Sequence, residues 1–257
     1  MKIGVCGKWE QAPLAKGMGF DYLEMSVTSL AELTEEAFQE RLGEKERLGF
    51  ETSRYNVLFP GTMALLVDDF SMEAMKNYLD RAFRRVHLMG GEICVFGSGK
   101  SRTRPEAVPY DEAFRRLIAV TRGIGEMAEK HGLTIAIEPL NRGECNMITS
   151  VAEGACLRAA VNHPRVSLLS DYYHVALEGE PEADIVRVSG VIHTHIAARE
   201  GRLYPTEMEE GFRRFFRALK DSDYRGSLSV EGRTENFEED GPRALKLLRA
   251  LAGEAGL

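Results

Sequence analysis

The strongest constraint on the fold of this chain is a regular alternation of short apolar runs with longer stretches of helical periodicity. The runs that have the length and composition of buried strands are residues 2–6, 22–26, 52–56, 93–96, 134–138, 166–170, 191–196 and 227–231. Between most of them, apolar residues recur at helical spacing, as in Leu79, Phe83 and Val86. Alternating strands and helices predict a parallel sheet, and eight such units predict that it closes into a barrel. We therefore predict an α/β fold, a (β/α)8 TIM barrel that forms a single domain over residues 1–257.

Helix starts are marked by capping residues. Thr34 and Ser71 each precede a helical stretch and can accept a hydrogen bond from its first turn. The weakest units are the first and the sixth, whose predicted helices, around residues 11–18 and 181–188, are short.

The composition excludes several classes of protein. The formal net charge is −7, whereas a nucleic-acid binder needs an excess of Lys and Arg on its phosphate-facing side. No stretch approaches the roughly 18 apolar residues that a membrane span requires. The 4 cysteines are scattered without a C-x-x-C pair, which is typical of free thiols in a reducing compartment. The chain is therefore predicted to be soluble and cytoplasmic, with a small molecule as its partner.

Potential metal ligands fall at the ends of the last four predicted strands. They are Glu138, Asp171, His195 and Glu231, and the active-site groups of a barrel come from these carboxyl ends. Alternation would put Ala136 and Glu138 inside the barrel, and would likewise put Val191 on the same face as His193 and His195. Each acidic residue taken alone could cap a helix, but three like charges at one end require a cation. Carboxylates with one imidazole suit Mn²⁺, Mg²⁺ or Co²⁺ better than a structural zinc site.

A glycine-rich loop follows the fourth predicted strand. Gly97, Gly99 and Lys100 invite a phosphate-binding interpretation, but neither common phosphate-loop spacing is present. A mobile loop at the barrel mouth is favoured instead. Lys100, Arg102 and Arg104 could meet a phosphate, but we expect them to be solvated.

Four ordered motifs carry a resemblance to a known family. They are EPLNRGECN at 138–146, DYYH at 171–174, HTH at 193–195 and EGR at 231–233. Together they resemble the xylose isomerase-like TIM-barrel superfamily, and within it the ketose 3-epimerases of the D-tagatose or D-psicose 3-epimerase type. The motifs cover the second half of the chain closely, whereas the first half agrees through its strand–helix rhythm and the loop at 96–102.

The resemblance implies a sugar isomerase or epimerase that binds one divalent metal ion per chain, with Mn²⁺ favoured and Mg²⁺ or Co²⁺ as alternatives. The metal ligands would be Glu138, Asp171, His195 and Glu231. Of these, Glu138 and Glu231 would also be the catalytic acid and base, exchanging a proton on opposite faces of the sugar through an enediolate.

The resemblance also implies three substrate contacts, Glu144, His174 and Arg202. Arg202 lies one residue farther from His195 than the family pattern has it, so Arg199 is an alternative. Asn146 and His193 are expected to support the site by orienting its ligands.

Several alternatives stay open at this point. A hydroxypyruvate isomerase, or a dehydratase of the inosose or dehydroshikimate type, could use the same metal and bases. An endonuclease IV-like DNA repair enzyme is disfavoured by the charge and by the positions of the other histidines, and a non-catalytic sugar-binding module remains a further alternative. The identity of the sugar, its phosphorylation and the formation of a homo-oligomer are left open.

Overall fold

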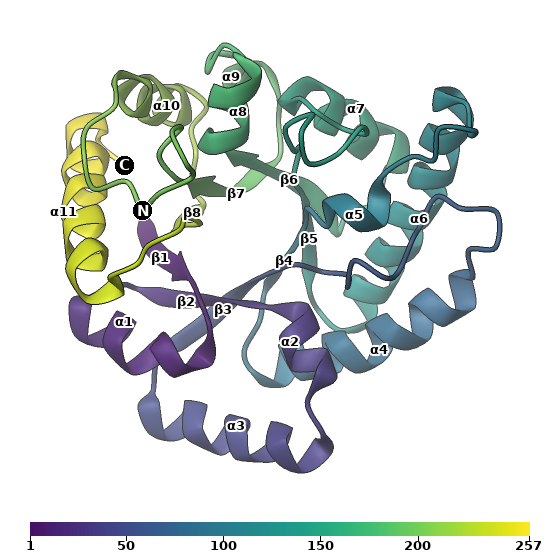
Figure 1. Cartoon of the computed structure of the whole chain (residues 1–257), viewed down its shortest axis with the longest axis horizontal. Coiled ribbons are helices and arrows are strands. Elements are labelled where there is room, and N and C mark those ends of the chain that lie inside the picture. The colour runs from purple at the N-terminus through teal and green to yellow at the C-terminus, as the bar shows by residue number, and fades with distance from the viewer.

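The chain folds into a closed barrel of parallel strands surrounded by helices (Figure 1). The computed structural model describes residues 1–257. The strands are β1 (Lys2–Cys6), β2 (Tyr22–Ser26), β3 (Glu51–Asn56), β4 (Ile93–Phe96), β5 (Thr134–Ile137), β6 (Val166–Asp171), β7 (Val191–Ile196) and β8 (Ser227–Val230). Each strand pairs with the next along the chain, and β1 pairs with β8 to close the sheet. The predicted (β/α)8 fold is confirmed.

The helices form the outer layer of the barrel (Figure 1). They are a short 3₁₀ helix η1 (Trp9–Gln11), then α1 (Ala12–Met18), α2 (Val27–Glu32), α3 (Glu35–Leu48), α4 (Met72–Leu88), α5 (Gly99–Arg102), α6 (Tyr110–Lys130), α7 (Val151–Val161), α8 (Tyr172–Glu178), α9 (Asp184–Arg187), α10 (Glu210–Asp221) and α11 (Phe237–Ala255). The predicted caps are confirmed. The Thr34 side chain accepts a hydrogen bond from the backbone amide of Ala37, and the Ser71 side chain accepts one from the backbone amide of Ala74.

Apolar side chains pack on both sides of the sheet. The large core lies between strands and helices and includes Leu228 and Val230 of β8, while Ser229 between them faces the interior. A small apolar cluster of Ile93, Val95, Ala136 and Leu169 fills part of that interior. Polar side chains fill the rest, and this mixture distinguishes the barrel interior from the outer core.

The predicted side-chain direction is wrong for one residue, Val191, at the start of β7. Val191 packs against the large outer core and Ile192 against the small interior cluster, which reverses the expected alternation. The register between β6 and β7 shifts at Leu168 and Leu169, so the alternation restarts before His193. His193 and His195 therefore point inward as predicted.

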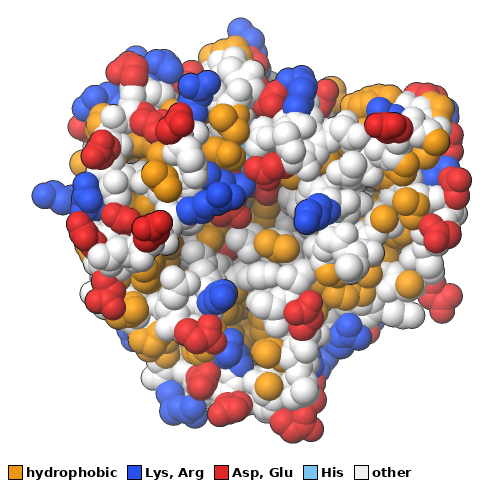
Figure 2. Space-filling view, in the orientation of Figure 1, with side chains coloured by type: hydrophobic (Ala, Val, Ile, Leu, Met, Phe, Trp, Pro, Cys, Tyr) orange, Lys and Arg blue, Asp and Glu red, His pale blue; other side chains and the backbone are white.

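Four strand boundaries differ by one residue from the sequence prediction: β3 begins at Glu51, β6 ends at Asp171, and β5 and β8 end one residue early. Glu138 and Glu231 lie just beyond β5 and β8 rather than within them. In the sixth unit, α8 follows β6 directly, and α9 is shorter than the predicted helix at 181–188. No helix is long and apolar enough to cross a membrane. On the face drawn in Figure 2, Lys and Arg side chains are interspersed with Asp and Glu.

Candidate metal centre and active site

The four strand-end residues predicted as ligands come together at one end of the barrel. Glu138, Asp171, His195 and Glu231 each offer a ligand atom within 4.8 Å of the others. Glu138, Asp171 and His195 are buried, and the side chain of Glu231 is 20% exposed. Parallel strands closed in sequence order bring these residues to a common edge, although they span nearly a hundred positions of the chain.

The imidazole of His195 presents one nitrogen to this cluster. Its Nδ1 lies 3.2 Å from Glu138 Oε1 and 3.3 Å from Glu231 Oε2. Its Nε2 points the other way, 3.0 Å from Glu24 Oε1. Only Nδ1 is therefore placed to share a cation with the three carboxylates.

Only one of the two carboxylate oxygens of Asp171 forms a hydrogen bond within the protein. Its Oδ1 accepts the amide of Tyr173 at 2.9 Å and so caps α8. Its Oδ2 is buried without a hydrogen-bond partner, and so is Nε2 of His174, 3.5 Å away. A buried carboxylate oxygen without a hydrogen bond is costly unless a cation compensates it; the Arg202 guanidinium lies 3.7 Å away, and Oδ2 remains available as a metal ligand.

The three carboxylates differ in how readily they ionise. Burial and the neighbouring Glu231 raise the pKa of Glu138, and burial raises the pKa of Asp171 to about 7. Burial would also raise the pKa of Glu231, but the His195 ring and the Arg202 guanidinium hold it at about 2. A divalent cation among these groups would stabilise the ionised form of all three. The set of three oxygen donors and one nitrogen fits such an ion.

Arg202 lies over the cluster. Its Nη2 is 2.5 Å from Glu231 Oε2 and 3.7 Å from Asp171 Oδ2, and its guanidinium stacks 4.8 Å from the ring centroid of Tyr173. Arg199 is exposed and bonds the carbonyl of Ala176. The geometry therefore favours Arg202 over Arg199 as the arginine of the site.

His174 and Glu144 lie beside Arg202. Glu144 Oε1 accepts Arg202 Nη1 at 3.2 Å and Asn141 Nδ2 at 2.9 Å. His174 Nδ1 accepts the backbone amide of Asn141 at 3.1 Å. Burial lowers the pKa of His174 to about 3, so the ring is neutral and its remaining N–H is at Nε2. The three residues thus offer a donor, an acceptor and a cation next to the four potential ligands.

Two expectations about supporting residues are wrong. The amide of Asn146 bonds the backbone of Arg104 through both its oxygen and its nitrogen, so it does not support the cluster. Arg102 is not solvated but fully buried, and its guanidinium donates to the carbonyls of Phe96 and Glu138. Of the loop cations, Lys100 is exposed, and Arg104 donates to the carbonyl of Val108.

The glycines of this loop make room for the cluster. A Cβ on Gly97 would lie 2.1 Å from Glu138 Oε2, and one on Gly99 would lie 2.8 Å from the carbonyl oxygen of Glu144. The loop that was expected to be mobile forms α5. Arg102 of this helix donates a hydrogen bond to the carbonyl of Glu138, just beyond β5, and so holds the loop against the strand end. The glycines therefore serve close packing around Glu138.

Replacing Arg102 by methionine should lower the free energy of unfolding by roughly 2–5 kcal/mol, because two buried carbonyls would lose their donor. Urea denaturation followed by circular dichroism measures this. Lys100→Met on the exposed side of the same short helix is the control and should change stability by less than about 0.5 kcal/mol. Equal stability of the two variants would contradict the claim that the hydrogen bonds of Arg102 hold the loop in place.

Two polar residues in the first half of the barrel were missed by the sequence prediction. Glu24 of β2 is fully buried and bonds both His193 and His195. Burial would raise the pKa of Glu24, but its contacts with these two imidazoles hold the pKa well below its usual range. Asn56 of β3 donates to Glu231 Oε1 at 3.2 Å. A carboxylate at an inward position of an otherwise apolar strand was the available signal for Glu24.

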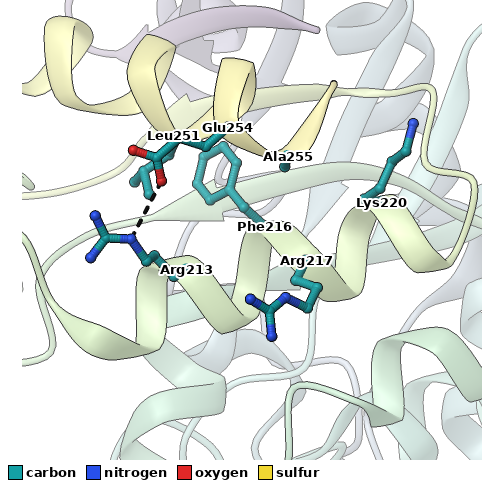
Figure 3. A pocket seen from close by; sticks show the side chains of 7 residues that line it. All are labelled: Arg213, Phe216, Arg217, Lys220, Leu251, Glu254 and Ala255. Atoms are coloured by element: carbon teal, nitrogen blue, oxygen red, sulfur yellow. Dashed lines mark hydrogen bonds and ion pairs between the residues drawn. The ribbon is translucent and has the colours of Figure 1, made fainter.

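A groove away from the barrel mouth lies between α10 and α11 (Figure 3). Its volume is about 380 Å³, and Arg213, Arg217 and Lys220 line it together with apolar side chains. None of the predicted site residues lines this groove. The groove is therefore separate from the cluster at the barrel end.

Fold and site together define a barrel whose strand ends bring together a carboxylate-rich group that could hold a cation. The profile of the xylose isomerase-like TIM barrel family matches residues 12–252, and the chain belongs to this family. A probable ketose 3-epimerase of Synechocystis sp. is 28% identical over 238 residues, which cover 88% of this chain and 77% of the relative. An L-ribulose 3-epimerase of Methylomonas sp. is 26% identical over 239 residues, covering 88% of this chain and 80% of the relative.

Solved structures share the same fold. A D-psicose 3-epimerase crystallised in the presence of D-fructose has a TM-score of 0.86 and 19% identity, covering 98% of this chain and 100% of that chain. At this identity the likeness concerns the architecture.

Proposed function

We propose that this chain is a metal-dependent epimerase that inverts the carbon next to the carbonyl of a small ketose. The observation that supports this proposal most directly is the placement of Glu138 and Glu231. Their carboxylates lie 3.2 and 3.3 Å from His195 Nδ1, and they follow β5 and β8, which are separated by β6 and β7. Two carboxylates at one cation site, entering from different sides, suit a reaction that removes a proton from one face and returns one to the other. Both relatives are named as 3-epimerases, and the chain is an enzyme of the isomerase and epimerase class.

The metal would be held by Glu138, Asp171, His195 and Glu231, with Mn²⁺ as the proposed ion. The free Oδ2 of Asp171 and the inward Nδ1 of His195 support this assignment. When bound, such an ion would polarise the carbonyl and the adjoining hydroxyl of the sugar and make the neighbouring C–H more acidic.

The two glutamates would share the proton transfers. One carboxylate accepts the proton from the carbon next to the carbonyl, and the other, protonated, returns a proton to the opposite face. Reversal of the two roles gives the reverse reaction, so a single pair serves both sugar epimers. Asp171 and His195 would hold the metal without moving a proton.

Glu144, His174 and Arg202 would bind the hydroxyls of the sugar. Two of these side chains are accessible at the rim of the cluster. The side chain of Arg202 is 20% exposed, and that of Glu144 is 40% exposed. The Nε2 of His174 has no hydrogen-bond partner within the protein and can donate to a sugar oxygen. Because Arg102 and Arg104 are engaged with backbone carbonyls, we propose an unphosphorylated sugar. Four free cysteines suit a reducing compartment such as the cytoplasm.

The variants Glu144→Gln, His174→Gln and Arg202→Lys should each lower kcat/KM by about tenfold or more, the usual effect of losing a hydrogen bond to a polar substrate. Each should retain about one metal ion per chain, as measured by elemental analysis, because none of these residues is assigned as a ligand. A parallel loss of metal in all three variants would assign them to the metal centre instead.

Assaying the Mn²⁺-loaded protein with a panel of free and phosphorylated ketoses tests the function itself. We expect conversion of a free ketose to its epimer, identified by nuclear magnetic resonance of the product. An aldose product would indicate aldose–ketose isomerisation, and a product with a new double bond would indicate a dehydratase. Either of these products without an epimer would overturn the proposal.

A further inference from the structure

A second carboxylate system lies inside the barrel, directly behind His195. Glu24 of β2 is fully buried, and its Oε1 lies 3.0 Å from His195 Nε2. Its Oε2 lies 2.8 Å from His193 Nε2 and accepts the hydroxyl of Ser229 at 2.6 Å. No Lys or Arg forms an ion pair with Glu24, so the two imidazoles and the hydroxyl are its partners. A buried carboxylate is tolerated only where donors meet it in this way.

Ser227 holds the side of the His193 ring that faces away from Glu24. Arg54 Nε donates to Ser227 Oγ at 2.9 Å, and Ser227 Oγ lies 3.0 Å from His193 Nδ1. The carbonyl oxygen of Ser227 lies 2.9 Å from Nδ1 and also accepts a hydrogen bond from the hydroxyl of Tyr224 at 2.6 Å. Because a carboxylate can only accept hydrogen bonds, the 2.8 Å contact of Nε2 with Glu24 Oε2 puts a hydrogen of His193 on Nε2, facing Glu24.

A chain of hydrogen-bonding contacts thus runs through the barrel interior. It begins at Arg54, passes through Ser227 and His193, and ends at Glu24, whose other oxygen faces His195. A carboxylate can only accept hydrogen bonds, so its contact with His195 puts the imidazole hydrogen on Nε2. The lone pair of a neutral His195 is then on Nδ1, the nitrogen that faces Glu138 and Glu231.

We propose that Glu24 is a positioning residue that fixes the tautomer and the ring orientation of His195 so that Nδ1 is presented to the metal. This role rests on the metal centre of the proposed function and adds to it a residue that does not touch the ion. Hydrogen bonding of a carboxylate to the distal nitrogen of a metal-binding histidine orients the ring and strengthens it as a ligand.

Cys6, Glu24 and His195 also lie close enough to form a cation group of their own. One neutral imidazole cannot serve both groups, because a nitrogen that carries hydrogen has no lone pair to offer. The 3.0 Å contact of Nε2 with Glu24 assigns the hydrogen to that side. Glu24 therefore acts as a hydrogen-bond acceptor rather than as a ligand.

Glu24→Gln tests this role. An amide keeps the shape but offers one acceptor and one donor group, so it cannot accept from both imidazoles. We expect Mn²⁺ affinity, measured by isothermal titration calorimetry, to fall about 10–100-fold, the usual effect of losing such a partner. In the protein loaded with diamagnetic Mg²⁺, ¹⁵N resonances should show His195 protonated at Nε2 in the wild type, and a weakened or mixed tautomer in the variant.

Two controls separate this role from general effects. Glu180→Gln removes a half-buried carboxylate that accepts the amide of Val151 and contacts no site residue, so its Mn²⁺ affinity should match the wild type. Leu245→Ala in α11 weakens the outer core and should lower stability without altering the tautomer of His195.

The outcomes also separate this role from the proposed function. If the wild type bound no divalent ion, the metal centre itself would fail. If the wild type bound one ion and Glu24→Gln bound it equally tightly with an unchanged tautomer, only the role of Glu24 would be overturned. Two ions in the wild type and one in the variant would make Glu24 a ligand, which also overturns it.

Discussion

Glutamine in place of either Glu138 or Glu231 is expected to slow epimerisation by about 10²–10⁴-fold, the usual contribution of a positioned acid or base. Glutamine keeps the shape of the side chain and one ligating oxygen, so part of the metal should remain bound. It cannot accept or release the proton at neutral pH, and the proton transfer should therefore fail. The measurement compares kcat with metal content for each variant.

The matched comparison is Asp171→Asn. Since Asp171 is assigned to the metal alone, activity and metal content should fall together, and excess Mn²⁺ should restore part of both. Excess Mn²⁺ should not rescue the two glutamine variants. If both glutamine variants epimerised at nearly the wild-type rate with metal in place, the two-glutamate assignment would be wrong.

Removing the metal with a chelator is expected to reduce turnover to the background rate, and Mn²⁺ or Co²⁺ should restore it. The barrel should stay folded, because the large apolar core does not depend on the cluster. Metal binding to the native state alone should also raise the free energy of unfolding, by about 2.7 kcal/mol at a hundredfold excess over Kd. Full activity in metal-free protein would contradict the mechanism, and an unchanged unfolding midpoint would contradict the site.

The sequence predicted the barrel because its signals are local. Each strand is a short apolar run, and the intervening helices show their own periodicity and caps, as at Thr34 and Ser71. The four clustered residues were predictable for the same reason, since each lies at or just beyond the carboxyl end of a strand. A closed parallel barrel turns that position in the sequence into proximity in space.

The errors arose where the deciding partners are distant in the chain. Arg102 looked like a solvated loop cation, but the carbonyl of Glu138, which lies 36 positions away, accepts its guanidinium. Glu24 lies within an apolar strand, and its partners His193 and His195 come from β7, so its role depends on closure of the barrel. The reversed facing of Val191 and Ile192 follows from a register shift between β6 and β7, which the composition of a single strand does not reveal.

The helix after β6 was missed for a different reason. The prediction assigned Asp171 to a strand end and began the helix at residue 181. In the structure, Asp171 is also the N-cap of α8, with Oδ1 on the amide of Tyr173 and Oδ2 free. Capping of α8 therefore uses only one oxygen of this aspartate and leaves the other available for the proposed metal ion.

The most direct test of the account is the fate of deuterium during epimerisation in D₂O with the Mn²⁺-loaded protein. We expect the inverted carbon of the product to carry deuterium from solvent, because the proton that is removed and the proton that is returned belong to different carboxylates. In Glu138→Gln and Glu231→Gln, net inversion should slow by about 10²–10⁴-fold, while the surviving carboxylate still exchanges hydrogen on its own face of the sugar. Inversion by the wild type that retained the original hydrogen through complete turnover, or glutamine variants that inverted the carbon at the wild-type rate, would contradict transfer between two glutamates.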